Sequence, residues 1–528
     1  MFHNPSDENK SSKLLRRARL SEILKADSNI NILLVFIGIF LFLPRLCLEL
    51  KLDELGSFWV IKDSLQDTIH RSLHLGQSPF YYIILWLSYK VFGSSEMALR
   101  IPSLLCILSS ALLMIRLGTL LFSREVGVFS AFAFISSFQA IVAATDARPY
   151  ALAILFTFIS TLNLVEWCKT GSKRYLTFYC LSVTATIYAH YLFGLILVPH
   201  ALWVIFNFNR DRKPLIKQVL VAGMGLSLLL IPALHHVREF SAKTEGKAFA
   251  KTPEILDLLS AVIPTESILL IVLIFIFHIL VWKVPKGACK SLIDISITRG
   301  AVTTLAIFLL VPVLIIYAVS IFSGNSIFVE RYFGQRIIGI GLLGGIMICS
   351  FHGVARRAIL LSCLLLIIAI NHYSYGFSER AGDGFGRAVH RIQTEDGSGK
   401  CQLLIMSGFI EAQTIGWLSG GLTREFIIAP LSYYKVKNPV TPIPYAFNTK
   451  EAVEYYSHLV SHTLDITTCV WLMHRNVELH VSGKEQPLSA MEIEKHLLEN
   501  LGFRQSHRSL HGFVEVVGYQ SARDSGSL

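Results

Sequence analysis

The chain is poor in charge and lacks the motifs that hold metals or nucleotides. Only 16% of its 528 residues are charged, whereas 53% are hydrophobic, and the mean hydropathy is +0.53. So few charges exclude an ordinary soluble globular protein. The nine cysteines show neither a Cys-x-x-Cys pair nor the Cys/His spacing of a zinc site. The segment Ser419-Gly420-Gly421 lacks the Lys of a phosphate-binding loop and predicts only a turn.

What the chain has instead is a series of long apolar stretches separated by short basic loops. The stretches run to roughly 15–25 residues, the length of membrane-spanning helices. The Lys and Arg residues behind the net charge of +11 cluster in the loops, as the positive-inside rule expects of cytoplasmic loops. The net positive charge is therefore explained by membrane topology. We expect no nucleic-acid partner. We also expect no cleavable signal peptide, because the basic N-terminus runs directly into a full-length stretch.

The stretches predict about eleven spans. Residues 1–29 are rich in Lys and Arg, which places the N-terminus in the cytoplasm. The predicted spans are residues 30–48, 98–122, 126–144, 150–167, 175–189, 192–208, 215–235, 268–282, 301–322, 337–351 and 358–372. The chain is thus predicted to be a multi-pass inner membrane protein. Because the number of crossings is odd, its C-terminal residues are placed on the outer side of the membrane.

One short apolar segment, Pro79–Phe92, decides which motifs share a face. Its 14 residues reach about 21 Å as a helix, short of a hydrocarbon core of about 30 Å. Its tyrosines and tryptophan suit the membrane interface. The segment is therefore predicted to lie along the interface without crossing. The acidic motifs Asp53-Glu54 and Asp146–Tyr150 then lie together on the outer face.

The chain is predicted to divide into three parts. Residues 1–29 form the cytoplasmic N-terminus and residues 30–372 an all-α polytopic membrane domain of about 11 transmembrane helices, with interfacial helices in the first outer loop. Residues 373–528 are predicted to form a small α/β extracytoplasmic domain. Its expected strands are residues 402–406, 469–474 and 513–519, and its expected helices are residues 450–460 and 490–501. Whether Cys401 and Cys469 form a disulfide stays open, because their separation in space is unknown.

The acidic motifs have ordinary structural explanations when each is taken alone. Asp53-Glu54 could cap a helix that starts near Leu55, and Asp146 could cap the helix that follows Pro149. Arg148 is harder to explain in this way, since a half-buried guanidinium requires a carboxylate or phosphate partner. Together, acids that take a proton and arginines that stabilise phosphate suit an enzyme acting on a lipid-linked anionic substrate.

Six motifs follow one another in a fixed order along the chain. They are Leu52–Glu54, Ser78–Tyr82, Gly93–Pro102, Asp146–Tyr150, His190-Tyr191 and Arg331-Tyr332. In this order they resemble the multi-spanning C-type glycosyltransferases that use polyprenyl-phosphate sugars. That superfamily includes the protein O-mannosyltransferases and the aminoarabinose transferases of lipid A, and the chain is most similar to the bacterial protein-mannosyltransferase-like proteins.

The resemblance implies roles for individual residues. Asp53 matches the family's catalytic base, with Glu54 as its support, and Asp146 stands where the family often has Glu. The family's His-Pro-Pro is Gln77-Ser78-Pro79 here, so a role for that His is lost or moves to His74 or His70. We assign the donor phosphate to Arg148 and Arg331. The expected substrate contacts are Tyr82, Tyr150, His190, Tyr191 and Tyr332.

The predicted function is transfer of a sugar from a polyprenyl-phosphate donor, with inversion, to an acceptor at the outer face. The acceptor could be a glycolipid, a polysaccharide or a protein. No cofactor is expected, although a divalent cation held by Asp53 and Asp146 is the alternative to side-chain cations.

The rival function is a transporter or flippase of lipid-linked sugars, but the chain lacks the internal repeats of such proteins. A non-catalytic scaffold would leave the acidic motifs unexplained.

The topology can be tested by cysteine labelling in a background without the native cysteines. Single cysteines at Gln66 and at Ser95 should both react with a membrane-impermeant thiol reagent in intact cells, because the segment between them does not cross. If the cysteine at Ser95 reacts only after permeabilisation, the segment crosses and the two acidic motifs lie on opposite faces.

Overall fold

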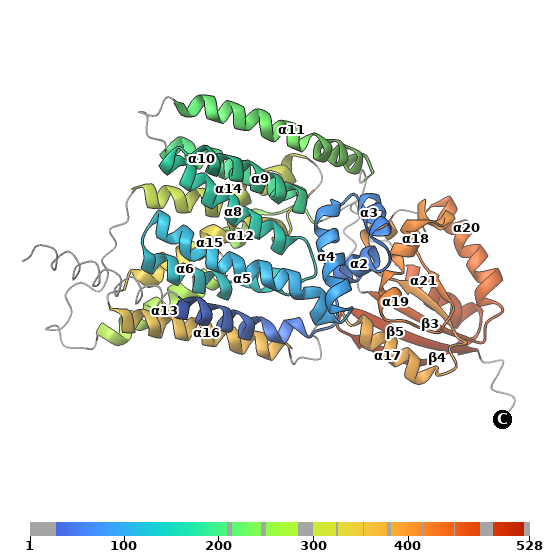
Figure 1. The fold of residues 1–528 in the computed structure, drawn as a ribbon. Coiled ribbons are helices and arrows are strands. Elements are labelled where there is room, and N and C mark those ends of the chain that lie inside the picture. Colours follow the sequence, from blue (N-terminus) through green and yellow to red (C-terminus); the bar gives the residue numbers. More distant parts are fainter. Residues whose placement is uncertain are drawn as a thin grey trace, which may run out of the picture.

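A computed structural model describes most of the chain. The described residues are 28–207, 214–243, 250–263, 265–282, 299–323, 326–351, 353–376, 382–413, 416–447, 449–475 and 489–521. A bundle of long helices forms one end of the molecule and a β-sheet with its helices forms the other (Figure 1). Three short helices, α2 (Leu52–Ile61), α3 (Leu65–His74) and α4 (Pro79–Phe92), lie between the two ends.

The bundle is built from helices that are apolar on nearly all faces, as expected for helices surrounded by lipid and by one another. They are Ser28–Leu46, α5 (Glu96–Leu121), α6 (Arg124–Ser136), α7 (Phe138–Ala144), α8 (Tyr150–Thr170), α9 (Lys173–Ala189), η1 (Tyr191–Ile196), α10 (Leu197–Asn207), α11 (Pro214–Lys243), α12 (Ile255–Val262), α13 (Thr265–Trp282), α14 (Arg299–Phe322), η2 (Glu330–Arg336), α15 (Ile337–Cys349) and α16 (Val354–Gly376). Glycines allow close packing: a Cβ at Gly118 of α5 would lie 2.6 Å from the Cα of Gly127 of α6.

As far as they are described, all eleven predicted spans lie on helices, but not all of these helices are long enough for a full crossing. Within the described ranges, seven helices are long and apolar enough to cross a membrane, and up to nine if each bent pair is one span. One bent pair is α6 and α7, which meet at 65°. The two remaining predicted spans are α9 and the segment Tyr191–Asn207, each only 17 residues long.

The helix α4 has the bounds predicted from the sequence. Pro79 occupies its first turn, the Ser78 hydroxyl accepts the N–H of Phe80 at 3.3 Å, and Gly93 ends the helix at φ 87°. The helix runs across the ends of the bundle helices and not alongside them (Figure 1). It is not among the candidate spans found in the described part of the chain. This arrangement agrees with an interfacial position.

The C-terminal region, residues 382–521 as far as they are described, contains a mixed five-stranded sheet. Its strands are β1 (Gln402–Met406), β2 (Val440–Pro442), β3 (Cys469–Arg475), β4 (Phe503–His511) and β5 (Val514–Ser521), in the order β2-β1-β3-β5-β4. β1 is parallel to β2 and β3, whereas β5 is antiparallel to β3 and β4. The other elements are α17 (Phe385–Glu395), α18 (Leu422–Ile427), α19 (Ala429–Tyr433), α20 (Lys450–Leu459), α21 (Ser489–Lys495), the 3-10 turns η3 (Ile410–Gln413) and η4 (Gly416–Ser419), and the π-helical turns η5 (Val460–Leu464) and η6 (His496–Asn500).

The two faces of the sheet belong to different hydrophobic cores. Leu403 and Ile405 of β1 join the core that also contains the bundle helices and α2. Leu404 and Met406, on the opposite face, join a separate core within the C-terminal region. The alternation follows from the two-residue period of a strand. The sheet is therefore packed continuously against the rest of the molecule.

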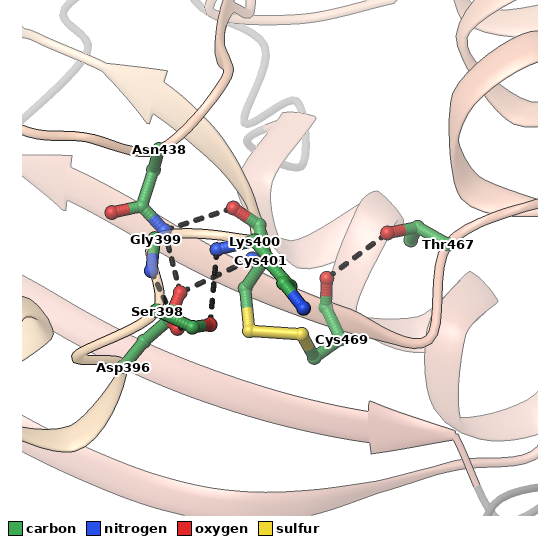
Figure 2. Close-up of a disulfide and its surroundings, with 8 residues drawn as sticks. All are labelled: Asp396, Ser398, Gly399, Lys400, Cys401, Asn438, Thr467 and Cys469. Atoms are coloured by element: carbon green, nitrogen blue, oxygen red, sulfur yellow. Dashed lines mark hydrogen bonds between the residues drawn. A yellow bond between two sulfur atoms is a disulfide. The ribbon is translucent and has the colours of Figure 1, made fainter.

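The three predicted strands and two predicted helices are present, whereas β2 and β4 were not predicted. β2 is only three residues long, and β4 is an edge strand with mostly polar, exposed side chains. Figure 2 shows the disulfide that joins Cys401 and Cys469 at the starts of β1 and β3. The adjacent register pair, Gln402 opposite Val470, explains why the two cysteines are close enough to bond.

Removal of this disulfide should destabilise the C-terminal region. Loss of a crosslink across 68 residues costs about 2–4 kcal/mol. The double variant Cys401→Ser/Cys469→Ser should therefore melt at a lower temperature than the wild type in detergent. Replacement of the free, exposed Cys363 by Ser is the matched control and should leave the melting temperature unchanged. Equal melting of the double variant and the wild type would contradict the expectation.

Candidate active site between the bundle and the C-terminal region

The first turn of α2 carries the two acidic residues Asp53 and Glu54, which have different surroundings. Glu54 is completely buried and forms an ion pair with Arg100 of α5, with 2.6 Å between Oε2 and Nη2. Its carboxylate also accepts the N–H groups of Lys51 at 2.9 Å and Ala147 at 2.8 Å. Burial alone would raise the pKa of Glu54, but the charges and hydrogen bonds of Arg100 and Lys51 hold it below its ordinary value.

Arg100 also holds the chain that leads into α2. Its guanidinium donates to four carbonyl oxygens at 2.6–3.1 Å, those of Arg45, Leu46, Leu48 and Glu49. Only 1% of its side chain is exposed, so its charge has no contact with water. A charge this deeply buried is stable only with such a full set of partners. Arg100 therefore fixes where the helix Ser28–Leu46 ends and where α2 begins.

Asp53 lies in a partly open position between arginines. Its Oδ2 forms an ion pair with Nη1 of Arg331 at 2.7 Å, and 39% of the Asp53 side chain is exposed. Burial acts to raise the pKa of Asp53, but the positive charges of Arg148, Arg331 and Arg475 outweigh it and lower the pKa below its ordinary value. Asp53 is therefore ionised at neutral pH.

Asp146, on the loop between α7 and α8, also lies close to the start of α2. Its carboxylate forms an ion pair with Lys51, the residue before α2, and its carbonyl accepts the Ser103 hydroxyl at 2.6 Å. Burial raises the pKa of Asp146, although the ion pair with Lys51 opposes this effect. The acidic motifs are thus brought together by contacts that join them directly.

Arg148 lies beside Asp53 without a carboxylate partner. Its Nη1 is 3.3 Å from the carbonyl oxygen of Asp53, 3.4 Å from the Ser57 hydroxyl and 3.5 Å from the Tyr82 hydroxyl. These are long contacts to neutral groups, and its buried Nε has no hydrogen-bond partner. Within the described residues, no carboxylate oxygen lies within 4.0 Å of its guanidinium. Arg148 therefore has charge available for an anion.

Aromatic rings form one wall of the site. The centroid of the His190 ring lies 5.0 Å from that of Tyr150 and 5.6 Å from that of Tyr332. Arg331 lies 5.6 Å over the Tyr332 ring. Burial lowers the pKa of His190 to about 3, so the imidazole is neutral at physiological pH. Tyr191 packs against the hydrophobic core.

The positive and negative charges of the site are unequal in number. The charged cluster consists of Lys51, Asp53, Glu54, Arg100, Asp146, Arg148 and Arg331. With each group in its ordinary ionised form, four cations face three carboxylates. One positive charge remains in excess, and by the contacts above it belongs to Arg148. Among the described residues no group of three or more side chains suited to a metal ion is present.

The C-terminal region contacts the chain just before and at the start of α2. Arg387 lies 3.8 Å from the Glu49 carboxylate, and the Tyr434 hydroxyl accepts the N–H of Leu50 at 3.1 Å. Asp383 accepts the N–H of Leu52 at 2.7 Å. The segment that leads into α2 is thus bound by Arg100 up to Glu49 and by the C-terminal region from Glu49 to Leu52.

Sequence reasoning missed Lys51, Arg100, Asp383 and Arg475. Arg100 gave a usable signal, because an Arg within a predicted span implies a buried partner. Lys51 stands two residues before Asp53 and gave none on its own. The His74 ring, an alternative for the missing histidine of the family, contacts the Thr423 hydroxyl of the C-terminal region at 2.9 Å.

The comparisons with known proteins agree with this architecture. Residues 76–236 match the family described as dolichyl-phosphate-mannose-protein mannosyltransferase. No curated protein matches the chain. The solved structure of ArnT from Cupriavidus metallidurans in the apo state is similar with a TM-score of 0.57 and 11% identity, and covers 93% of this chain and 98% of that chain. The structure of the same protein bound to undecaprenyl phosphate has a TM-score of 0.53 and 11% identity, covering 92% and 97%.

These likenesses confirm the resemblance found in the sequence. The similarity to ArnT extends over nearly the whole of both chains and shows a shared multi-pass membrane fold. The family match lies within that fold and contains α4, Arg100 and the Asp146–Tyr150 motif. The chain therefore has the multi-pass membrane fold of ArnT, and within that fold residues 76–236 match the mannosyltransferase family.

Proposed function

We propose that the protein transfers a sugar from a polyprenyl-phosphate donor to an acceptor hydroxyl at the outer face of the inner membrane, with inversion at the anomeric carbon. The observation that carries this proposal is the position of Asp53, an ionised and partly exposed carboxylate between Arg148 and Arg331. A base and phosphate-binding cations are thereby adjacent, as a displacement from a phosphate leaving group requires. The ligand in the ArnT structure, undecaprenyl phosphate, is a polyprenyl phosphate without a sugar, the kind of group that leaves in the proposed transfer.

The proposed step is a single displacement. The acceptor oxygen forms a bond to the anomeric carbon as the bond from that carbon to the phosphate oxygen breaks. Asp53 takes the acceptor proton, and the phosphate keeps the electron pair of the broken bond. Arg148 and Arg331 hold the phosphate, and the departure of Arg331 from Asp53 toward the donor would free the carboxylate to accept the proton.

The charge of the site suits this step. The charged cluster has one excess positive charge, and a sugar phosphodiester carries one negative charge. After transfer the lipid phosphate is a monoester with close to two negative charges at neutral pH. Protonation of Asp53 in the same step leaves the protein with two excess positive charges. The site would therefore match its ligand before and after the reaction, without a counterion entering from water.

The other predicted site residues receive supporting roles. Glu54 is fully occupied by Arg100 and two backbone N–H groups, so we assign it to holding α2. Asp146, paired with Lys51, would line the acceptor side. The aromatic side chains of Tyr150, His190 and Tyr332 would contact the sugar. Tyr82 and Tyr191 would contact it as well. A divalent cation between Asp53 and Asp146 would first have to displace Arg331 and Lys51.

We further propose that residues 1–29 are cytoplasmic, that residues 30–372 are the transmembrane domain, and that residues 373–528 lie on the outer side. The acceptor would be a glycolipid, a polysaccharide or a protein. Mass spectrometry of glycolipids and glycoproteins from cells with and without the gene would give the sugar and the acceptor class together.

Replacement of the proposed base should abolish transfer without loss of the fold. Asp53→Asn removes the proton acceptor, and general bases contribute about 10²–10⁴-fold to rate. The exposed ion pair with Arg331 adds little stability, so melting should change slightly. The measurement is release of free polyprenyl phosphate from a labelled donor incubated with membranes that supply the acceptor.

Two outcomes would contradict the assignment. Full release by the Asp53→Asn protein would exclude Asp53 as the base. Movement of the labelled lipid across the membrane without cleavage would mark a transporter. The matched control is Asp63→Asn, whose carboxylate pairs with Arg71 and which should retain activity.

Glu54 should behave differently from its neighbour. Glu54→Gln leaves the charge of Arg100 buried without an anion, which costs about 3–5 kcal/mol. The variant should give little folded protein in detergent and a clearly lower melting temperature, whereas Asp53→Asn should melt close to the wild type. A Glu54→Gln protein that melts normally but lacks activity would place Glu54 among the reacting groups.

A further inference from the structure

The first turn of α2 receives a hydrogen-bond acceptor from a distant part of the chain. The first N–H groups of any helix need acceptors outside it. The residue before α2, Lys51, provides no side-chain acceptor to the turn. The N–H of Leu52 instead donates to Oδ2 of Asp383, 331 positions later, at 2.7 Å in a buried setting. Asp383 therefore caps, from the C-terminal region, the helix that carries Asp53.

Asp383 is itself held rigidly. It stands between Gly382 at φ 76° and Gly384 at φ 96°, conformations that other residues rarely adopt. A Cβ at Gly384 would lie 1.8 Å from the carbonyl oxygen of His511, so only glycine fits against the hairpin of β4 and β5. The carbonyl of Asp383 accepts the N–H of Phe513 in the same hairpin at 3.0 Å. The position of the Asp383 carboxylate is thus set by the sheet.

A charged side chain of the sheet, that of Arg475, also lies beside the Asp383 carboxylate. Arg475 ends β3, and its Nε lies 3.5 Å from Oδ2 of Asp383. Its guanidinium lies 5.5 Å over the ring of Phe513. The positive charge of Arg475 is among those that act on Asp53. The Asp383 carboxylate therefore has two contacts, one to the backbone of α2 and one to an arginine near the proposed base.

We propose that Asp383 is a positioning residue for the transfer reaction, through which the C-terminal region sets the direction of the Asp53 carboxylate. The proposal rests on the function proposed above. Leu52 directly precedes Asp53, so the dihedral angles fixed by the Asp383 hydrogen bond determine where the Asp53 carboxylate points. A displacement of about 1 Å in a reacting group can cost about 10²-fold in rate. Asp383 touches no substrate in this scheme and acts only through α2.

The test compares three substitutions at one position in the full-length protein. Asp383→Ala removes the acceptor and should lower kcat by about 10–100-fold, with little change in the KM for the labelled donor, because Arg148 and Arg331 remain. Asp383→Asn keeps an acceptor oxygen for the N–H of Leu52 and should restore most of kcat. Asp383→Glu keeps the charge opposite Arg475, and with it the fold, but displaces the acceptor, and should lose at least about tenfold in kcat.

Asp396→Ala is the matched control. Asp396 also accepts backbone N–H groups in the C-terminal region, from Gly399 at 3.0 Å and Cys401 at 3.1 Å, but it is bound near the disulfide (Figure 2). Its loss should lower the melting temperature and leave kcat unchanged. A role for Asp383 in stability alone would make Asp383→Ala behave in the same way.

The outcomes separate this proposal from the one on which it rests. If Asp53→Asn is inactive while folded Asp383→Ala and Asp383→Glu both keep wild-type kcat, the positioning role is wrong and the transfer mechanism stands. If Asp53→Asn is fully active, the mechanism itself is wrong. If Asp383→Ala does not fold, Asp383→Glu decides: loss of kcat at normal donor KM supports the proposal, and normal kcat overturns it.

Discussion

The buried ion pair of Arg100 and Glu54 is the constraint on which the site depends. Neither charge can reach water, so each must be surrounded by partners, and these partners come from separate parts of the chain. Arg100 takes the carbonyls of residues 45–49, and Glu54 takes the N–H of Ala147. The end of the first helix, the start of α2 and the loop before α8 are thereby joined at one point. Asp53, beside this point, stays partly open and pairs with Arg331.

Much of this arrangement could be predicted from local sequence signals. The long apolar stretches gave helices at all eleven predicted places, because the hydrocarbon thickness sets their length. The bounds of α4 were predictable because Ser78-Pro79 and Gly93 mark a helix start and end chemically. The meeting of the Asp53 and Asp146 motifs followed from counting crossings, once α4 was taken not to cross. The number of full spans was predicted less well: the described residues contain seven to nine candidates and not eleven, since α9 and Tyr191–Asn207 are short helices.

The partners of the acidic residues could not be predicted, because they depend on contacts between distant positions. The pairing of Lys51 with Asp146 and the capping of Leu52 by Asp383 leave no mark in local periodicity. For the same reason Glu54 and Asp53 looked alike in sequence, although one is buried and the other is partly open. The strand β4 escaped because an edge strand with exposed polar side chains lacks the apolar alternation that identifies inner strands.

The continuous core beneath the sheet has a consequence for modularity. Leu403 and Ile405 of β1 pack into the same core as the bundle helices, so this face of the sheet is not a surface in the native protein. A C-terminal region produced alone would present that face to water and would tend to self-associate. Chimeras between relatives are subject to the same limit. A sheet exchanged alone would lose its packing partners on this face, so the sequences it can accept are limited by α2 and by the bundle helices of the same core.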